Sequence, residues 1–177
     1  ISKPHADYKS VDENLSNFLE FKELENGRGV YAISVDWKKI HNKKVIQCIE
    51  KNSTQKNVIY IGTVKKKGNI FSRCNQEINN TGHATFFRKN GSVLGYKSMS
   101  RNSQIKKNNF RIESSDKEKI KKWNHKNLRL KIFNTFSSNE KALIQYFKPP
   151  FNEINNRDFT CEEINFLRNK NKGGGYI

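Results

Sequence analysis

The chain has 177 residues, with 34 Lys and Arg against 17 Asp and Glu and a formal net charge of +17. This length fits one compact domain. Its charge attracts polyanions, either nucleic acid or anionic lipid headgroups, although abundant Lys and Asn also fit a compositional bias of the source genome. No run of about 18 apolar residues exists, and no basic helix has a long apolar face, which excludes a membrane span and disfavours a membrane anchor. Composition therefore favours nucleic acid as the partner.

The cysteines and the two ends of the chain add weaker signals. Cys48, Cys74 and Cys161 are scattered and form no metal-binding or disulfide pattern, which favours a reducing, cytoplasmic location. A chain that opens on Ile1 without a signal peptide is expected to be a processed protein or a domain of something longer. The Gly173-Gly174-Gly175 run lacks the lysine of a phosphate-binding loop and is interpreted as a flexible tail.

The first third of the chain predicts one helix and two strands. Residues 11–25 have apolar groups at helical spacing, and the turn Asn26-Gly27 ends that helix. A strand follows over Gly29–Val35, with Tyr31, Ile33 and Val35 on one face. The second strand spans Val58–Val64, and its nearly continuous apolar character predicts burial on both faces. Residues 36–57 between them are interpreted as an insertion with a short helix over 44–51.

The middle of the chain predicts two helices and a loop. A helix over 69–79 places Ile70, Cys74 and Ile78 in one stripe, with Arg73 and Glu77 beside it. A shorter helix over 84–88 should give way to a loop. The polar and basic residues 98–109 are expected to form an exposed loop.

The last third predicts three helices and one strand. Ser115 and Glu118 form a predicted capping box for a helix that ends near Asn124. Leu128, Leu130 and Ile132 alternate with polar residues, as in a strand with one buried face. A helix over 139–147 ends at Pro149-Pro150, and a capping box of Thr160 and Glu163 opens the last helix. These elements predict a small mixed α/β domain rather than a Rossmann-like array.

Five features follow one another in a suggestive order. Gly29-Val30-Tyr31 and Tyr60-Ile61-Gly62 lie on the two predicted strands. Arg73 follows on the next helix, Glu140 begins a later one, and Asn152 comes after the prolines. Over residues 29–152 this arrangement resembles the GIY-YIG nucleases. The resemblance implies an α/β (α+β) fold, in which a small, mostly antiparallel three-stranded sheet is flanked by helices and both tyrosines meet at one site.

The resemblance implies hydrolysis of phosphodiester bonds, which needs an activated water and positive charge on the phosphoryl oxygens. Tyr60 is expected to activate the water and Tyr31 to orient it. Because a tyrosine with a pKa of about 10 is a poor base, we expect nearby cations to lower that pKa. Arg73 would stabilise the developing negative charge, or would merely form a surface ion pair with Glu77 one helical turn on.

The resemblance also implies a metal ligand and a set of substrate contacts. Glu140 would be the only carboxylate ligand of Mg²⁺ or Mn²⁺, with water and phosphate completing the shell. Alternatively, Glu140 forms a capping box with Ser137. Asn152 would steady the site or serve as a turn residue, and His83 would lie near the cleaved phosphate. The expected nucleic-acid-binding residues are Lys65, Lys66, Lys67 and Arg88, although the three lysines also fit a solvated loop.

One departure from the family concerns the gap between the two tripeptides, where about twenty residues are inserted. A hairpin connection tolerates such lengthening at modest entropic cost. The insertion predicts a specialised member and offers additional surface for DNA. We expect a metal-dependent endonuclease that cuts double-stranded DNA, with an RNA-cleaving toxin domain or a non-catalytic binding module as alternatives. The predicted divisions are a helical extension (1–28), the nuclease domain (29–152) and a helix with a tail (153–177).

Overall fold

The computed structural model describes residues 13–14, 29–52, 57–64, 68–82, 84–100, 110–133, 139–153, 156, 161–170 and 172–173. The helices are Lys43–Asn52 (α1), Ile70–Asn79 (α2), Thr85–Val93 (α3), Ser114–Asn127 (α4), Glu140–Phe147 (α5) and Glu162–Lys170 (α6), and Trp37–Lys39 is a 3-10 turn (η2). The strands are Glu13–Asn14 (β1), Val30–Val35 (β2), Val58–Thr63 (β3), Ser98–Ser100 (β4), Phe110–Ile112 (β5), Leu128–Phe133 (β6) and Lys172–Gly173 (β7). No helix among these residues is both long and apolar enough to cross a membrane.

The main sheet consists of three six-residue strands and the very short β1, in the order β1-β6-β2-β3. All of its pairings are antiparallel, and β2 lies between β3 and β6. A second, smaller sheet has the order β5-β4-β7, with β4 and β7 parallel. The expected α/β fold with a small antiparallel sheet is therefore confirmed.

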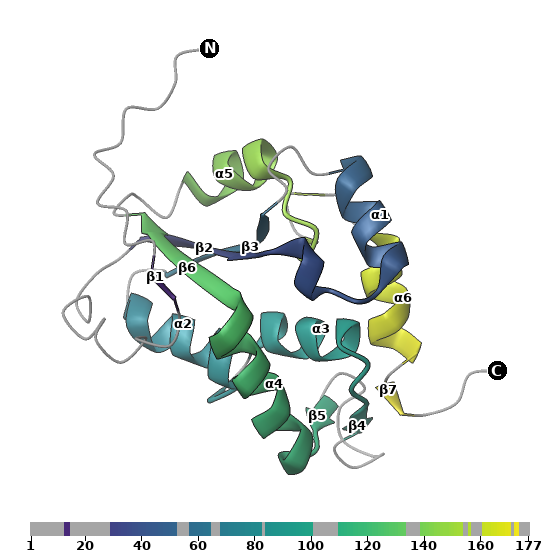
Figure 1. Ribbon diagram of the computed structural model, residues 1–177. Coiled ribbons are helices and arrows are strands. Elements are labelled where there is room, and N and C mark those ends of the chain that lie inside the picture. The colour runs from purple at the N-terminus through teal and green to yellow at the C-terminus, as the bar shows by residue number, and fades with distance from the viewer. Residues whose placement is uncertain are drawn as a thin grey trace.

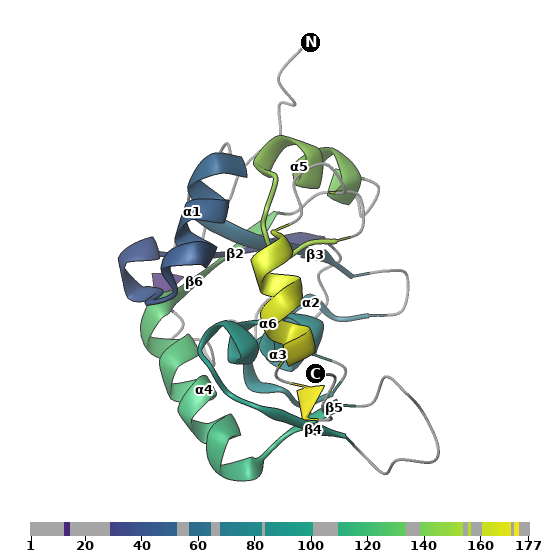
Figure 2. The ribbon, with the colours of Figure 1, turned by 90° about the vertical axis from the view of Figure 1, so that its right-hand side faces the viewer.

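Helices cover both faces of the main sheet (Figure 1). Tyr31, Ile33 and Val35 pack with the buried side chains of α2 and α3 in the largest core cluster. Val30 and Ala32 point to the other face, where Ile144 of α5 joins them. Figure 2 shows α6 beside α1 and α3, and the core includes buried residues of all three helices. This alternation follows from the two-residue period of a strand.

Several sequence predictions are confirmed. The two tyrosine strands, the strand that begins at Leu128 and the helices α1, α2, α5 and α6 lie where expected, to within one or two residues. In α2 the predicted stripe of Ile70, Cys74 and Ile78 is buried, and the Asn69 side chain caps the helix by accepting a hydrogen bond from Ser72 N. The residues called an insertion contribute Val45 and Ile49 of α1 to the core.

Other predictions were wrong in the region after α2. α3 continues to Val93 because Gly91 packs closely against α4, where a Cβ atom would lie 2.9 Å from Ile120 Cδ1. Ser98–Ser100 is a strand rather than an exposed loop, because β5 and β7 pair with it. Both differences depend on long-range packing, which overrides local propensity.

The remaining corrections concern element ends. Glu13 and Asn14 are extended because they pair with the edge of β6, whereas a helix was predicted there; residues 15–28 lie outside the described part. The Ser115 capping box does not form: α4 begins at Ser114, its cap residue has no side-chain hydrogen bond, and Glu118 binds Lys121 instead. Gly173, predicted to lie in a tail, pairs with Met99 in the small sheet.

Candidate active site

The two signature tyrosines lie on the same face of neighbouring strands. Tyr31 is opposite Gly62 and Ile33 is opposite Tyr60 in the β2–β3 register, so the two phenol rings are diagonal neighbours with centroids 6.2 Å apart. Phe86 of α3 lies on the far side of Tyr60, with a centroid distance of 5.4 Å. Tyr31 is fully buried, whereas Tyr60 is partly exposed. The antiparallel pairing thus brings one buried and one partly exposed tyrosine to the same place.

Gly62 makes room for the ring of Tyr31. A Cβ atom at Gly62 would overlap the Tyr31 phenol and lie 2.9 Å from its Cε1 atom. Because any larger residue would displace the ring, the glycine of the second tripeptide has a steric role. The Tyr31 hydroxyl is buried without a hydrogen bond of ordinary geometry, yet it lies near enough to Tyr60 and Arg73 to affect the pKa of each.

Arg73 is held by a buried carboxylate. Its Nη2 atom lies 2.5 Å from Glu77 Oε1, and its Nη1 donates a hydrogen bond of 3.2 Å to Gln76 Oε1. The Glu77 side chain is 0% exposed, whereas that of Arg73 is 31% exposed. The other carboxylate oxygen, Glu77 Oε2, accepts a hydrogen bond of 2.8 Å from Phe86 N at the start of α3. The predicted pair between Arg73 and Glu77 forms, but it is not a surface pair, because Glu77 belongs to the core and fixes the guanidinium at its edge.

A hollow opens beside Arg73, between the end of β3 and the first turns of α2. Its volume is about 470 Å³, and it is lined by Thr63, Val64, Gly68, Asn69, Ser72, Arg73 and Gln76. Most of the lining residues have polar side chains, and Arg73 contributes the positive charge. A phosphate group in this hollow can therefore accept hydrogen bonds from the guanidinium.

Glu140, on another helix, acts on Tyr60 through its charge. It is the first residue of α5, which packs on the opposite face of the sheet through Ile144. Glu140 is partly exposed, and its negative charge contributes to the raised pKa of Tyr60. Asn139 precedes it as the cap residue without a side-chain cap bond, and Ser137 lies outside the described residues. The site thus has an accessible carboxylate near Tyr60.

Burial dominates the electrostatics of the tyrosines. Desolvation raises the pKa of Tyr60, the charge of Glu77 raises it further, and Arg73 opposes both. The pKa of Tyr31 is also raised, by burial first and then by Tyr60 and Glu77. The expectation that cations lower the Tyr60 pKa is therefore wrong, because desolvation and nearby carboxylates outweigh one guanidinium. Burial likewise raises the pKa of Glu77, against the opposing effect of Arg73.

Asn152 binds the backbone of β3 next to Tyr60. Its Oδ1 atom accepts from Ile61 N and its Nδ2 atom donates to Ile61 O, both at 2.8 Å. Phe151 N donates to Ile59 O at 3.0 Å, so the segment after the prolines runs along the free edge of β3. Asn152 is buried. Its side chain therefore supports the strand that carries Tyr60.

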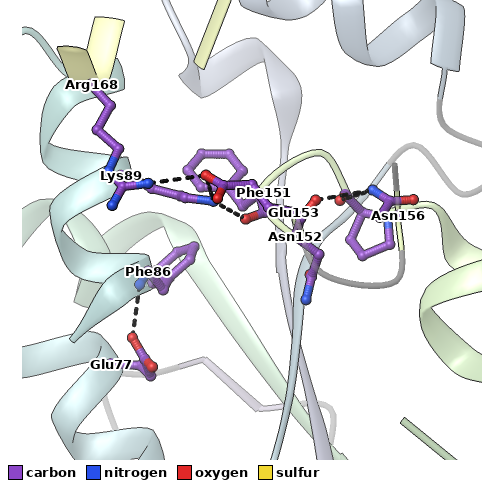
Figure 3. A network of polar contacts seen from close by, with 9 residues as sticks. Glu77, Phe86, Lys89, Phe151, Asn152, Glu153, Asn156 and Arg168 are labelled. Atoms are coloured by element: carbon purple, nitrogen blue, oxygen red, sulfur yellow. Dashed lines mark hydrogen bonds and ion pairs between the residues drawn. The ribbon is translucent and has the colours of Figure 1, made fainter. Parts of the chain in front are cut away.

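The buried Lys89 also binds the segment that carries Asn152 (Figure 3). Lys89 Nζ donates to Phe151 O at 2.7 Å and forms an ion pair with Glu153 at the same distance. Glu153 also pairs with Arg168 of α6, at 3.0 Å. Burial lowers the pKa of Lys89, and Glu153 opposes that change. One polar network thus connects α3, α6 and the turn that carries Asn152.

The predicted site residues are only partly brought together. Tyr31, Tyr60 and Arg73 interact, the charge of Glu140 acts on Tyr60, and Asn152 supports the strand that carries Tyr60. Arg88 lies partly buried on α3, where desolvation and then Arg168 lower its pKa. His83, Lys65, Lys66 and Lys67 lie outside the described residues.

Sequence reasoning missed two residues of this site. Glu77 is seven positions after Ile70 and so lies on the same face of α2, a spacing that could have placed it in the core. Lys89 follows Phe86 by three and precedes Val93 by four, which puts it on the buried face of α3 by the same argument. A buried ionisable group needs a partner, and each of the two has one.

The geometry agrees with comparisons against known families. The family model described as the GIY-YIG catalytic domain matches residues 29–170. No curated protein and no solved structure is similar enough to match the chain. The matched region includes both tyrosine strands, α2, α5 and the Lys89 network through α6. The chain therefore belongs to the GIY-YIG family, and its domain is of the nuclease type.

Proposed function

We propose that the chain is a metal-dependent endonuclease that hydrolyses phosphodiester bonds in DNA. The observation that carries this proposal is that the charges of Arg73 and Glu140 both act on the phenol of Tyr60. Phosphodiester hydrolysis needs a positioned water and stabilisation of negative charge, which a hydroxyl, a guanidinium and a metal-binding carboxylate can supply. Binding alone does not need a carboxylate facing a polyanion.

Arg73 and the tyrosines have separate roles in this proposal. The guanidinium binds a phosphate oxygen in the adjoining hollow and stabilises the charge that grows in the transition state. Tyr60 stays protonated at neutral pH because its pKa is raised, so its hydroxyl orients the attacking water through a hydrogen bond. The water oxygen bonds to phosphorus while the bond to the leaving sugar oxygen breaks. The surplus proton leaves to solvent. Tyr31 packs beneath and positions Tyr60.

Glu140 is the residue that would hold a divalent metal. Among the described residues, no three His, Cys, Asp or Glu side chains form a cluster. One carboxylate with water and phosphate oxygens is a ligand set that suits Mg²⁺, which keeps several waters, and also Mn²⁺. The accessible Glu140 beside Tyr60 fits this requirement. The bound ion would supply positive charge at the leaving oxygen.

The test compares Glu140→Ala with a matched control on another helix. Glu162 is also the first residue of its helix and is exposed, so Glu162→Ala controls for the loss of a helix-start carboxylate. We expect the native chain and Glu162→Ala to nick plasmid DNA with Mg²⁺ or Mn²⁺, and Glu140→Ala to lose this activity. EDTA should abolish nicking by all three. If the native chain binds plasmid but leaves it intact, the catalytic proposal fails. Cleavage of tRNA with no cleavage of plasmid would instead identify an RNA nuclease.

A further inference from the structure

A second hollow lies away from the tyrosines, where β2 ends and β6 begins. Its volume is about 380 Å³, and it is lined by Lys39, His41, Lys122, Trp123, Lys126 and Asn127. Lys39 of η2 and the nearby His41 line one side, and residues of the last turns of α4 line the other. We name this hollow the η2–α4 groove. It is built partly by the segment that lengthens the gap between the two tyrosine strands.

The groove carries positive charge that the described acidic residues do not neutralise. Lys39, Lys122 and Lys126 are exposed, and no acidic side chain lines the hollow. None of these three lysines takes part in the ion pairs found among the described residues. On the same helix, Lys119 and Lys121 are paired with acidic residues one turn earlier. Lys39 and Lys126 are therefore available to an anion, and Lys122, whose charge also acts on Glu118, is in no ion pair with it.

The floor of the groove is apolar and firmly placed. Trp123 is partly buried and packs against the main core, which fixes its ring. Lys122 and Lys126 are one helical turn apart on either side of it, so their aliphatic stems extend the apolar surface. Cationic rims around an aromatic floor are typical of surfaces that follow a nucleic-acid strand, because phosphates contact the rims and sugars or bases contact the ring. A compact anion would contact the lysines but would not contact the ring of Trp123.

The distance to the active site suits one continuous substrate. Tyr31 lies at the start of β2 and Val35 at its end, so four residues separate the tyrosine from the strand end that leads into the groove. At about 3.3 Å per residue this is roughly 13 Å. Duplex DNA rises by about 3.4 Å per base pair, so this length of strand corresponds to about four base pairs.

We propose that the η2–α4 groove binds the sugar–phosphate backbone of the nucleic-acid substrate several nucleotides from the bond that is cut. This inference rests on the proposed nuclease function for its substrate. It assigns a binding role to Lys39, Lys122, Trp123 and Lys126, which take no part in the chemistry. Substrate contacts in this groove contribute affinity rather than rate, so the groove should govern KM and salt dependence.

The test replaces the groove lysines together and measures binding without catalysis. The groove variant is Lys39→Gln, Lys122→Gln and Lys126→Gln, and the control is Lys51→Gln, Lys97→Gln and Lys170→Gln, which removes the same charge from other exposed positions. Binding of a fluorescent DNA duplex is measured in EDTA over a range of salt concentrations, with circular dichroism to confirm folding. We expect the groove variant to bind the duplex at least about tenfold more weakly than the native chain. The slope of the logarithm of its binding constant against the logarithm of the salt concentration should be smaller by about 2 to 3, and the control variant should show a smaller change.

The outcomes separate this proposal from the nuclease proposal. The groove proposal is overturned if the groove and control variants lose affinity equally. It is also overturned if polyglutamate displaces the fluorescent duplex from the native chain as effectively as unlabelled DNA of equal charge does. If the native chain cuts plasmid and the groove variant cuts it with an unchanged KM, the nuclease proposal stands and the groove proposal fails. Conversely, if the native chain cuts no nucleic acid but only the groove variant loses binding, the groove proposal stands and the nuclease proposal fails.

Discussion

Among the described residues, the charges of Arg73, Glu77 and Glu140 act on Tyr60. Desolvation and both carboxylates favour the protonated phenol, whereas Arg73 and the Tyr31 hydroxyl oppose them. A tyrosine in these surroundings stays protonated at neutral pH and can form hydrogen bonds, but it does not act as a phenolate base. The role proposed for Tyr60 at neutral pH is therefore to orient water, which requires position more than basicity.

Alkaline titration provides the first prediction. The chain has six tyrosines, and we expect Tyr31 and Tyr60 to ionise above the ordinary value of about 10. Because their folded pKa values are raised, they contribute stability that is fully present below about pH 10 and is lost as pH rises further. Ultraviolet absorbance of tyrosinate should show a late phase in the native chain. Tyr60→Phe should reduce that phase, and Tyr96→Phe should leave it unchanged. A late phase that persists undiminished in Tyr60→Phe would contradict the prediction.

Glu77 gives the second prediction at this scale. Glu77→Gln keeps an acceptor for Phe86 N but removes the charge that holds Arg73. We expect kcat for DNA cleavage to fall by about tenfold to a hundredfold, since a small displacement of a phosphate-binding group has effects of that order. Substrate affinity in EDTA should change little. The control is Glu118→Gln, an exposed carboxylate paired with Lys121, which should leave kcat unaltered. Equal activity in both variants would mean that Glu77 does not position Arg73.

At the scale of elements, the edge of β3 is completed by a segment that is not a strand. Asn152 offers its amide to both backbone groups of Ile61, and Phe151 N pairs with Ile59 O. The turn after Pro149-Pro150 is held in place by Lys89. The strand that carries Tyr60 is thus paired on both sides, which restricts the position of its hydroxyl.

Removal of the Asn152 amide is the third prediction. Asn152→Ala leaves Ile61 N and Ile61 O without their partners, and buried groups left unpaired cost about 1–3 kcal/mol each. We expect the free energy of unfolding to fall by about 2–4 kcal/mol after partial relaxation. Urea denaturation measures this difference. The exposed Asn169→Ala in α6 should change stability by about 0.5 kcal/mol or less. A similar small effect for Asn152→Ala would show that water replaces the amide.

The elements also show what the sequence could and could not predict. α2 was predictable because its apolar stripe and the Asn69 cap are both local signals. The end of α3 was not, because Gly91 is a poor helix residue that α4 packs against. β4 depends on partners from two distant segments. At the site, the family resemblance placed Tyr31 and Tyr60 together correctly, but the pKa of Tyr60 depends on burial, which the resemblance does not supply.

At the scale of the whole molecule, segments outside the tyrosine strands build the support of the site. α6 contacts α1 and α3, and Ile164 of this helix and the preceding Cys161 are 1% exposed in the main core. Arg168 completes the network that includes Lys89 and Glu153. The family match also continues to residue 170. We propose that the last helix is part of the catalytic domain.

Two substitutions on α6 test this proposal. Ile164→Ala removes a fully packed side chain and should lower the free energy of unfolding by about 2–5 kcal/mol, with a matching loss of nuclease activity at elevated temperature. Phe166 is on the same helix but is 56% exposed, so Phe166→Ala should cost less than about 1 kcal/mol. Thermal unfolding followed by circular dichroism measures both changes. We expect a single cooperative transition in each case, because α6 shares its core with the tyrosine strands. A separate early transition in Ile164→Ala, with activity retained above it, would instead show that α6 unfolds independently and that the catalytic domain ends before it.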